Sequence, residues 1–292
     1  FHLFHRADLV DLLRHALENV ETRLVARVTG AALEGARPSV TLQGGETIRA
    51  DLVIGADGLH SVLRPEIEGP GADPFFTGQV AWRALVPGDS DDAVAQVFMG
   101  PGRHLVSYPL RGGTLRNIVA VEERSAWAEE GWNLRDDAAH LRAAFAGFGG
   151  PVPGWLAQVD KVWLWGLFRH PVARHWTRRC AALIGDAAHP TLPFMAQGAN
   201  LALEDALTLA RALEQGKPDQ VLPLWARHRH TRCARAIKAA NANARNYHLR
   251  GPIAPLAHAA LRLSGWIAPQ GALRRFDWLY AYDAAGCDLT RA

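Results

Sequence analysis

The stretch ALIGDAAHPTLPFMAQGANLALEDALTLARAL, residues 182–213, places a strand, a loop and a helix in direct succession. Its apolar opening predicts a buried strand that ends at Gly185-Asp186, and Gln197-Gly198 opens a long helix. Open α/β sheets bind their ligands in crevices at the carboxyl ends of such strands. The order of elements therefore predicts a ligand site around residues 185–198.

The residue types in this stretch suit a polar ligand that lies against the backbone. Asp186 is placed to accept hydrogen bonds from ligand hydroxyls, such as those of a sugar or polyol chain, and Gly185 leaves space beside it. Pro190 and Pro193 stiffen the loop. The first N–H groups of the following helix favour an anionic or electron-rich group, for which a reduced flavin qualifies. An ordinary strand-loop-helix with an Asp cap is the alternative.

The helix itself shows two faces. Its spacing predicts a polar stripe at Glu204, Thr208, Arg211 and Gln215, opposite an apolar face at Ala202, Ala206, Leu209 and Leu213.

A second stretch, DLVIGADGLHSVLRP at residues 51–65, repeats the order of strand, Asp and helix. Asp57-Gly58 predicts a turn, and a short helix with Ser61 and Arg64 is expected to stop at Pro65. One Asp-Gly turn is a weak signal. Two such junctions in one chain predict two acidic corners that share a crevice.

Composition bounds the class of protein. The 292 residues are 49% hydrophobic and 21% charged, which is typical of a soluble globular protein of about two domains. Cys180, Cys233 and Cys287 are scattered, which argues against a disulfide framework or a zinc site and favours a reducing compartment. No apolar run reaches about 20 residues, and no leader is evident, so a cytoplasmic location without a membrane span is expected.

The net charge of +3 is a mild excess and does not predict nucleic-acid binding. The basic stretch 225–250 is interpreted as a helix with solvated arginines. Its His228, His230 and Cys233 are not expected to bind metal, since helix positions two apart do not share a face.

The remaining elements are expected as follows. Residues 7–20 predict a helix with Asp8 at its N-cap, and residues 22–33 and 39–58 predict strands, with Gly44-Gly45 supplying positive φ angles to a hairpin turn. Runs at 77–87, 92–100, 103–110 and 114–123 lack intervening helices and predict an antiparallel sheet. A helix around 136–148 and a strand near 162–168 follow, and the chain is mostly helical from about residue 218.

Three stretches carry a family resemblance. GADGLHSVLR and GDAAHPTLPFMAQGANLALEDA resemble the Asp-Gly and Gly-Asp motifs of class A flavoprotein monooxygenases, the FAD-dependent aromatic hydroxylases, and FHRADL resembles their arginine-bearing segment. Further stretches look like the branch of salicylate and 3-hydroxybenzoate hydroxylases: GQVAWRALVP, LVSYPLRGG, NYHLRGP and FDWLYAYD.

The resemblance implies an α/β fold with an FAD-binding, Rossmann-like domain of the p-hydroxybenzoate hydroxylase type. That domain would occupy residues 1–72 and 176–217, be incomplete at its N-terminus, and be interrupted by an antiparallel-sheet substrate domain at 73–175, with a helical region at 218–292.

It also implies the cofactor contacts. Asp186 would bind the ribityl chain of FAD, the backbone of residues 198–200 would face the pyrimidine end of the isoalloxazine, and Arg6 would contact the pyrophosphate or ribose. Asp57-Gly58, supported by Arg64, would serve FAD and reduced nicotinamide nucleotide together. The complete implied set is Arg6, Asp57, Gly58, Arg64, Gly185, Asp186, Gln197, Gly198, Ala199 and Asn200.

Two departures from the family pattern are visible. Ala196 stands where the family usually has Gly, and its methyl group is expected to allow only negative φ. No GxGxxG follows a strand, so the fingerprint that seats a pyrophosphate on a helix N-terminus is absent. We therefore expect that the first βαβ unit is missing and that these residues alone bind FAD poorly.

The implied reaction is hydroxylation of a small aromatic acid or phenol by O2 through a flavin C4a-hydroperoxide, at the expense of NAD(P)H. The candidate catalytic residues are Pro193 beside the reactive edge of the flavin, and Tyr108, His104 and His189 for handling the phenol proton. Structural roles for these last three are equally open. Arg83 or Arg116 could pair with a substrate carboxylate, although solvated strand charges are the favoured reading.

The expected partners are the aromatic substrate and O2, without nucleic acid, metal or membrane, and monomer and homodimer both stay open. The alternatives are a related flavoenzyme (an epoxidase, a halogenase, or a hydroxylase of polyketide or quinone precursors) and an inactive fragment that cannot hold FAD.

Overall fold

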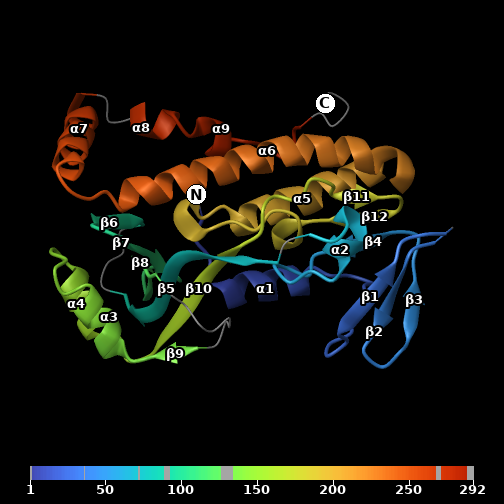
Figure 1. Cartoon of the computed structure of the whole chain (residues 1–292), viewed down its shortest axis with the longest axis horizontal. Coiled ribbons are helices and arrows are strands. Elements are labelled where there is room, and N and C mark those ends of the chain that lie inside the picture. Colours follow the sequence, from blue (N-terminus) through green and yellow to red (C-terminus); the bar gives the residue numbers. More distant parts are fainter. Residues whose placement is uncertain are drawn as a thin grey trace. The chain divides into compact units, whose positions relative to one another are not determined.

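The computed structural model of the chain describes residues 2–35, 37–71, 73–88, 93–125, 134–267 and 271–287. Figure 1 follows the chain from blue at the N-terminus to red at the C-terminus. Contacts between residues divide the chain into two compact units. The first comprises Phe1–Arg23, Phe76–Leu167 and Arg245–Ala254, and the second comprises Leu24–Phe75, Phe168–Ala244 and Pro255–Ala292. The chain thus crosses between the units several times, and each unit is described by itself.

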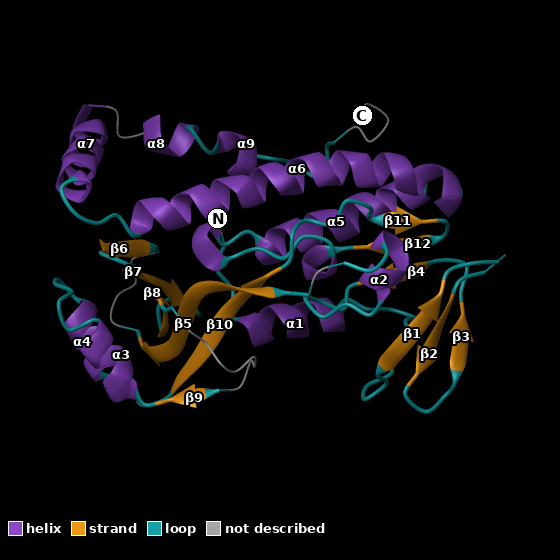
Figure 2. Ribbon diagram, viewed as in Figure 1, coloured by secondary structure: helices purple, strands orange, loops and turns teal. Residues whose placement is uncertain are grey.

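The first unit is built on a six-stranded sheet in the order β6-β7-β8-β5-β10-β9 (Figure 2). Its elements are α1 (Arg6–His15), β5 (Phe75–Pro87), β6 (Gln96–Gly100), β7 (Arg103–Leu110), β8 (Leu115–Glu123), β9 (Arg135–Asp136), α3 (Ala138–Ala144), α4 (Val152–Ala157) and β10 (Val162–Arg169). The pairs β6–β7, β7–β8 and β5–β8 are antiparallel, as the spacing of strand-like runs predicts. The predicted helix near residue 136 is also confirmed, with Asp137 capping α3 through the N–H of Ala139.

The two faces of this sheet differ in what covers them. Trp82, Leu105 and Ala120 lie on one face and form a core with side chains of α3 and α4, among them Phe145 and Trp155. Side chains alternate between faces along a strand. The neighbouring positions of these three strands therefore lie on the opposite face, where the candidate catalytic residues of the first unit are found.

The second unit holds two three-stranded sheets and most of the helices. Its elements are β1 (Val28–Ala32), β2 (Ser39–Leu42), β3 (Thr47–Arg49), β4 (Val53–Gly55), α2 (Leu63–Glu68), β11 (Thr177–Arg178), β12 (Ala181–Leu183), the 3-10 turns η1 (Gly185–Ala187) and η2 (Pro193–Met195), α5 (Gly198–Leu213), α6 (Pro218–Tyr247), α7 (Ile253–Ile267), α8 (Gly271–Arg274) and α9 (Asp277–Tyr280). β1, β2 and β3 are antiparallel, whereas β4 and β12 are parallel neighbours.

The core of the second unit lies between the β4–β12 pair and helices α5 and α6. β12 is buried along its whole length, as the apolar run predicts, and Leu183 packs in one cluster with Leu201 of α5 and Trp225 of α6. The chain is therefore a mixed α/β fold with an antiparallel sheet inserted between its α/β parts, and the predicted fold class is confirmed.

Four local predictions were wrong. The first helix ends at His15 instead of near residue 20, and Asp8 lies in its first turn while His5 is the N-cap. No side chain of α1 is buried, so no packing extends the helix beyond its first stretch. At the β2–β3 turn only Gly45 has positive φ, at 84°. Pro65 does not stop α2 but lies in its first turn, where a missing N–H breaks no helical bond.

Among the described residues, no helix combines the length and the apolar character that crossing a bilayer requires.

Candidate functional site

The two acidic corners lie at the same edge of one sheet. β4 and β12 run parallel with Gly55 opposite Leu183, and the N–H of Ile184 donates to the carbonyl oxygen of Gly55 at 3.0 Å. Asp57 and Asp186 follow these strands within three residues. The structure thus brings together the two motifs that are far apart in the sequence.

Asp57 holds the start of α2. Its Oδ2 accepts hydrogen bonds from the N–H groups of Val62 at 2.7 Å and Leu63 at 3.2 Å. Ser61 accepts a further bond from the N–H of Arg64 at 2.9 Å, and Gly58 makes the turn with a φ of 77°. The turn predicted at Asp57-Gly58 is present, a short helix follows it, and the Asp57 side chain therefore shapes the turn.

Arg64 joins the two motifs. The residue is 8% exposed, and its guanidinium donates to Glu68 Oε2 at 3.0 Å and to the carbonyl oxygens of Pro171 at 2.8 Å and Ala187 at 3.4 Å. Ala187 follows Asp186 directly. Arg64 therefore sets the position of the Asp186 corner relative to the Asp57 turn.

Asp186 is the exposed residue in a buried turn. Gly185 and Ala187 on either side of it are buried, and η1 directs the chain sharply after β12. Gly185 has a φ of 59°, and a Cβ there would lie 3.2 Å from the Cβ of Ala202 on α5. Glycine is thus required both for the turn and for the close approach of the helix.

Ala196 corrects an expectation from the sequence. It adopts the left-handed conformation, with φ 51° and ψ 36°, although its methyl group was expected to exclude positive φ. The loop from η2 to α5 imposes this conformation, which costs an alanine about 1–2 kcal/mol relative to the right-handed region. Pro193 opens η2 and is half-buried.

The beginning of α5 has the features expected of a flavin site. Gln197 at its N-cap makes no side-chain capping hydrogen bond, and Ala199 and Asn200 are exposed there, next to a half-buried Gly198. Gln197 is 4% exposed, and its Nε2 has no hydrogen-bond partner in the part of the chain that the structure describes. Uncapped amides, an unpaired buried amide group and the exposed Asp186 fit the pyrimidine and ribityl parts of FAD.

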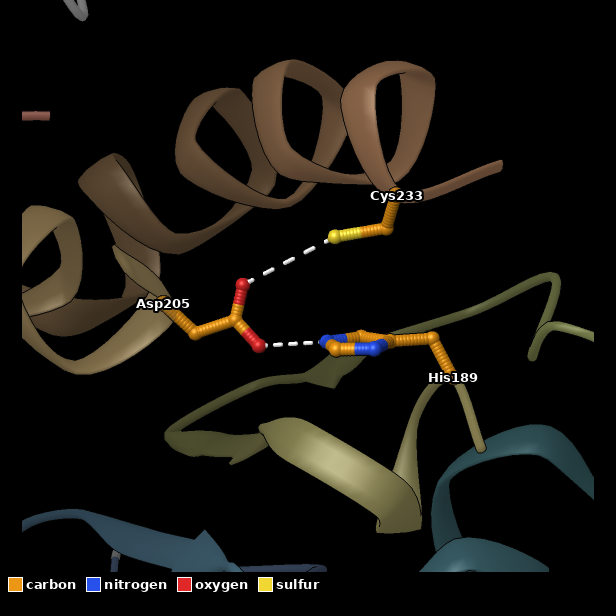
Figure 3. A group of neighbouring side chains, drawn as sticks. All are labelled: His189, Asp205 and Cys233. Carbon is orange, nitrogen blue, oxygen red and sulfur yellow. Dashed lines mark hydrogen bonds and ion pairs between the residues drawn. The ribbon is translucent and has the colours of Figure 1, made fainter. Parts of the chain in front are cut away.

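A buried polar cluster lies behind this site (Figure 3). Asp205 of α5 is fully buried and accepts hydrogen bonds from the Gly185 N–H at 3.0 Å and from Arg229 Nε at 2.8 Å. Its Oδ2 lies 2.5 Å from His189 Nε2, and the Sγ of Cys233 lies 3.9 Å from its Oδ1. Asp205 therefore fixes the backbone immediately before Asp186.

The protonation states follow from these contacts. Burial alone would lower the pKa of His189, but the hydrogen bond and charge of Asp205, together with Cys233, raise it to about 10. Burial would raise the pKa of Asp205, whereas His189, Arg229 and the Gly185 N–H lower it. The cluster thus holds an imidazolium and a guanidinium around one carboxylate.

The same cluster has the residue types of a metal site, since the ligand atoms of His189, Asp205 and Cys233 lie within 4.8 Å of one another. Arg229, however, places its positive charge 2.8 Å from the carboxylate that would bind the metal ion. The charge of this carboxylate is thus already paired with a guanidinium, which disfavours a metal ion there. His189 is 1% exposed and stacks on Trp176, so its ring has a structural place in this cluster.

The sequence did not predict this cluster, and two interpretations are corrected by it. α5 turns Asp205 and Thr208 inward and leaves Ala206 exposed, against the predicted division of its faces. Arg229 of α6 is fully buried, although the arginines of this helix were interpreted as solvated. The signal available in the sequence was the Glu204-Asp205 pair, whose carboxylates bind Arg229 and Arg232.

In the first unit, three candidate residues share one face of the sheet. Val119 of β8 is opposite Val106 of β7 and opposite Arg83 of β5. His104 and Tyr108 are each two residues from Val106, so they lie on the same face as Arg83. The face is the one that α3 and α4 do not cover.

The structure places Arg83 and Arg116 on opposite faces of the sheet. Arg83 stacks on Trp165 at 4.1 Å, and its Nε is buried without a hydrogen-bond partner in the described chain. Arg116 lies on the opposite face, where it is 5% exposed, donates to Ser107 at 3.1 Å and stacks on Trp155 at 4.3 Å. Arg116 is therefore a residue of the sheet core, and Arg83 is the arginine with unused hydrogen-bonding capacity.

Electrostatics connect the residues on this face. Burial lowers the pKa of Arg83, the nearby Tyr108 raises it, and the like charge of Arg6 lowers it. Burial raises the pKa of Tyr108, and Arg83 lowers it. The first unit thus gathers Arg6, Arg83 and Tyr108, while the implied cofactor residues other than Arg6 belong to the second unit.

His104 is 1% exposed, and its Nδ1 lies 2.6 Å from Nε2 of His248. Burial, and then the neighbouring His248, lower the pKa of His104 to about 3. Its ring also lies 5.1 Å from that of Tyr247. The sequence pattern pointed to His104 but not to His248, although His248 lies in NYHLRGP, one of the stretches that resemble the hydroxylase branch.

The model of the FAD binding domain family matches residues 8–239. The chain is 32% identical to 3-hydroxybenzoate 6-hydroxylase of Polaromonas naphthalenivorans over 98% of its length and 72% of that protein. It is 30% identical to salicylate hydroxylase of Pseudomonas putida over 96% of its length and 69% of that protein.

Solved structures agree with these relatives. A salicylate hydroxylase substrate complex superposes with a TM-score of 0.78 at 26% identity, over 96% of this chain and 73% of that one. Klebsiella pneumoniae HpxO complexed with FAD and uric acid gives a TM-score of 0.69 at 27% identity, over 81% of this chain and 61% of that one. On its motifs, its fold and these similarities, the chain belongs to the class A FAD-dependent aromatic monooxygenases.

Proposed function

We propose that this protein hydroxylates a small aromatic acid that carries a phenolic hydroxyl, and that Arg83 binds the carboxylate of this substrate. The observation that supports this is the shared sheet face of His104, Tyr108 and Arg83. This face combines the guanidinium of Arg83, which can bind a carboxylate, with the side chains of His104 and Tyr108, which can interact with a phenol.

Different residues of the chain are proposed to bind the cofactor and to handle the substrate. When bound, FAD reduced by NAD(P)H supplies activated oxygen to the aromatic ring. Asp186 and the first amides of α5 are proposed to hold the cofactor through its ribityl chain and its electron-rich edge. Tyr108 orients the phenol through its hydroxyl group, and His104 accepts the phenol proton, since a phenolate ring reacts more readily with an electrophilic oxygen.

The environment of Arg83 supports recognition of an acid. The Trp165 ring packs against the guanidinium and fixes its plane, and the like-charged Arg6 lies near enough to lower its pKa. Two guanidinium groups that have no ion-pair partner among the described residues favour a bound anion. A planar carboxylate matches the fork of a guanidinium with two hydrogen bonds.

The test compares a hydroxybenzoate with the corresponding hydroxybenzamide, which has the same shape without the charge. Arg83→Gln should reduce kcat/KM for the acid roughly 10- to 100-fold, as expected for loss of a charged hydrogen-bonded pair. The amide should be almost unaffected. The matched control is Arg135→Gln, which removes another arginine stacked on a tryptophan of the same sheet. A variant that keeps the wild-type preference for the acid would contradict the assignment.

A further inference from the structure

We infer that His104, His248 and Glu123 form a proton relay that carries the phenol proton of the substrate from the buried face of the sheet to solvent. The inference rests on the proposed function and assigns roles to His248 and Glu123. Both are positioning residues that act through His104.

The three side chains are joined by short contacts. His104 Nδ1 lies 2.6 Å from His248 Nε2, and His248 Nδ1 lies 2.8 Å from Glu123 Oε1. The residues come from β7, from β8 and from the segment after α6, and all belong to the first unit. Hydrogen bonds of this length suit proton transfer between heavy atoms.

Exposure increases in one direction along the relay. The side chain of His248 is 2% exposed and that of Glu123 is 38% exposed. Glu123 and Arg250 line an open surface pocket of about 410 Å³, together with Thr77 and Gln79 of β5 and Arg124 and Ser125. The relay therefore begins at a buried imidazole and ends at a carboxylate in contact with solvent.

The hydrogen bonds have one consistent direction. The carboxylate of Glu123 can only accept, so His248 donates from Nδ1. Burial lowers the pKa of His248, although Glu123 raises it, so the ring is neutral near pH 7 and its Nε2 accepts from Nδ1 of His104. The lone pair of His104 is then on Nε2, the nitrogen that would receive a proton.

The relay takes up one proton at His104 and releases one proton from Glu123. His104 Nε2 takes the phenol proton while its Nδ1 proton moves to His248 Nε2. The Nδ1 proton of His248 moves to Glu123, which releases it to water. His104 alone is a poor base because burial disfavours its charged form, and the relay removes the charge from the buried ring in the same step.

Among the described residues, three neighbours bear on the relay: Arg250, Tyr247 and Glu122. Arg250 pairs with Glu123 and lowers the pKa of His248, and Tyr247 lies against the ring of His104. The adjacent Glu122 points to the other face of β8, where Arg103 and Arg124 pair with it at 3.1 Å each. The Glu123 carboxylate is thus the acceptor on this face.

The first experiment measures the relay without substrate or turnover. In protein with ¹⁵N-labelled histidine, NMR follows exchange of the His104 Nδ1 proton with water. Glu123→Gln should slow this exchange at least about tenfold, since it removes the base at the exposed end. His140→Gln is the matched control, because it breaks the His140–Asp136 pair, a surface imidazole–carboxylate contact of 2.7 Å in the same unit. An unchanged exchange rate in Glu123→Gln would overturn the relay, whatever the substrate proves to be.

The second experiment uses the FAD-loaded protein and an indicator dye to time proton release when a hydroxybenzoate binds. His248→Ala and Glu123→Gln should each slow release about tenfold or more, and imidazole in the buffer should restore the rate of His248→Ala alone. A purely structural role would give no such rescue. Release at the wild-type rate in both variants, from a protein that still hydroxylates the acid, would refute the relay and leave the proposed function intact.

Discussion

Asp205→Asn is the substitution with the largest expected effect on this protein. The Asp205 side chain is fully buried, and it accepts from a backbone N–H and from two positively charged side chains. The amide removes the negative charge, and Glu204 is then the one acidic partner of the fully buried Arg229 among the residues that the structure describes. The size of asparagine is nearly that of aspartate, so the loss is electrostatic.

The expected destabilisation is about 3–5 kcal/mol, the usual result of removing one partner of a buried ion pair. In a chain of 292 residues, this corresponds to a fall in Tm of about 5–8 °C. The FAD site should weaken as well, because Asp205 holds the Gly185 N–H next to Asp186.

The pH dependence gives a second, independent signature. The pKa of His189 is about 10 in the folded chain, compared with an ordinary value of 6.5. The stabilisation from this proton is therefore complete below pH 6.5 and is lost as the pH rises toward 10. Wild-type protein should lose stability across this interval, and Asp205→Asn should show a much smaller loss.

Urea unfolding followed by circular dichroism at several pH values measures both effects. Glu214→Gln is the matched control, since it makes the same chemical change at an exposed position after the end of α5. A free energy of unfolding for Asp205→Asn within about 1 kcal/mol of wild type, or an unchanged alkaline slope, would refute the role assigned to this cluster.

Three further predictions concern single side chains. Ala196→Gly should raise the free energy of unfolding by about 1 kcal/mol, because glycine adopts positive φ without strain. Chemical denaturation measures this difference, and a loss of stability would show that Ala196 is not strained. Asp186→Asn should weaken FAD binding roughly 10- to 100-fold in a fluorescence titration, and unchanged affinity would remove Asp186 from the cofactor site. Thr208→Val should destabilise the protein by about 1–3 kcal/mol in thermal unfolding. The indole N–H of the fully buried Trp225 donates to Thr208 Oγ1 at 3.0 Å and would lose this acceptor. Unchanged stability would show that the indole N–H has another acceptor.

Local signals predicted most of the fold. The antiparallel sheet followed from strand-like runs separated by Gly and Pro, and the parallel β4–β12 edge followed from two apolar runs that each end in Asp. These features depend on alternation, turn residues and helix starts, which are properties of neighbouring residues.

The local predictions that were wrong concern features that depend on tertiary packing. The stretch after His15 has a helical apolar pattern but buries nothing, so the helix stops. Ala196 has positive φ because its loop must join η2 to α5, which the preference of alanine does not reveal. The inward turn of Asp205 depends on His189, Arg229 and the Gly185 N–H, which come from three separate segments.

The sequence by itself determined the candidate residues of the site: Asp57 and Asp186 at strand ends, an uncapped helix after Gln197, and a sheet with His104 and Tyr108. Only the tertiary structure placed Arg83 on the face of His104 and Arg116 on the other, and linked His104 to His248 and Glu123. The physical reason is that strand register and buried hydrogen bonds join residues up to 144 positions apart, and a linear pattern carries no information on such pairs.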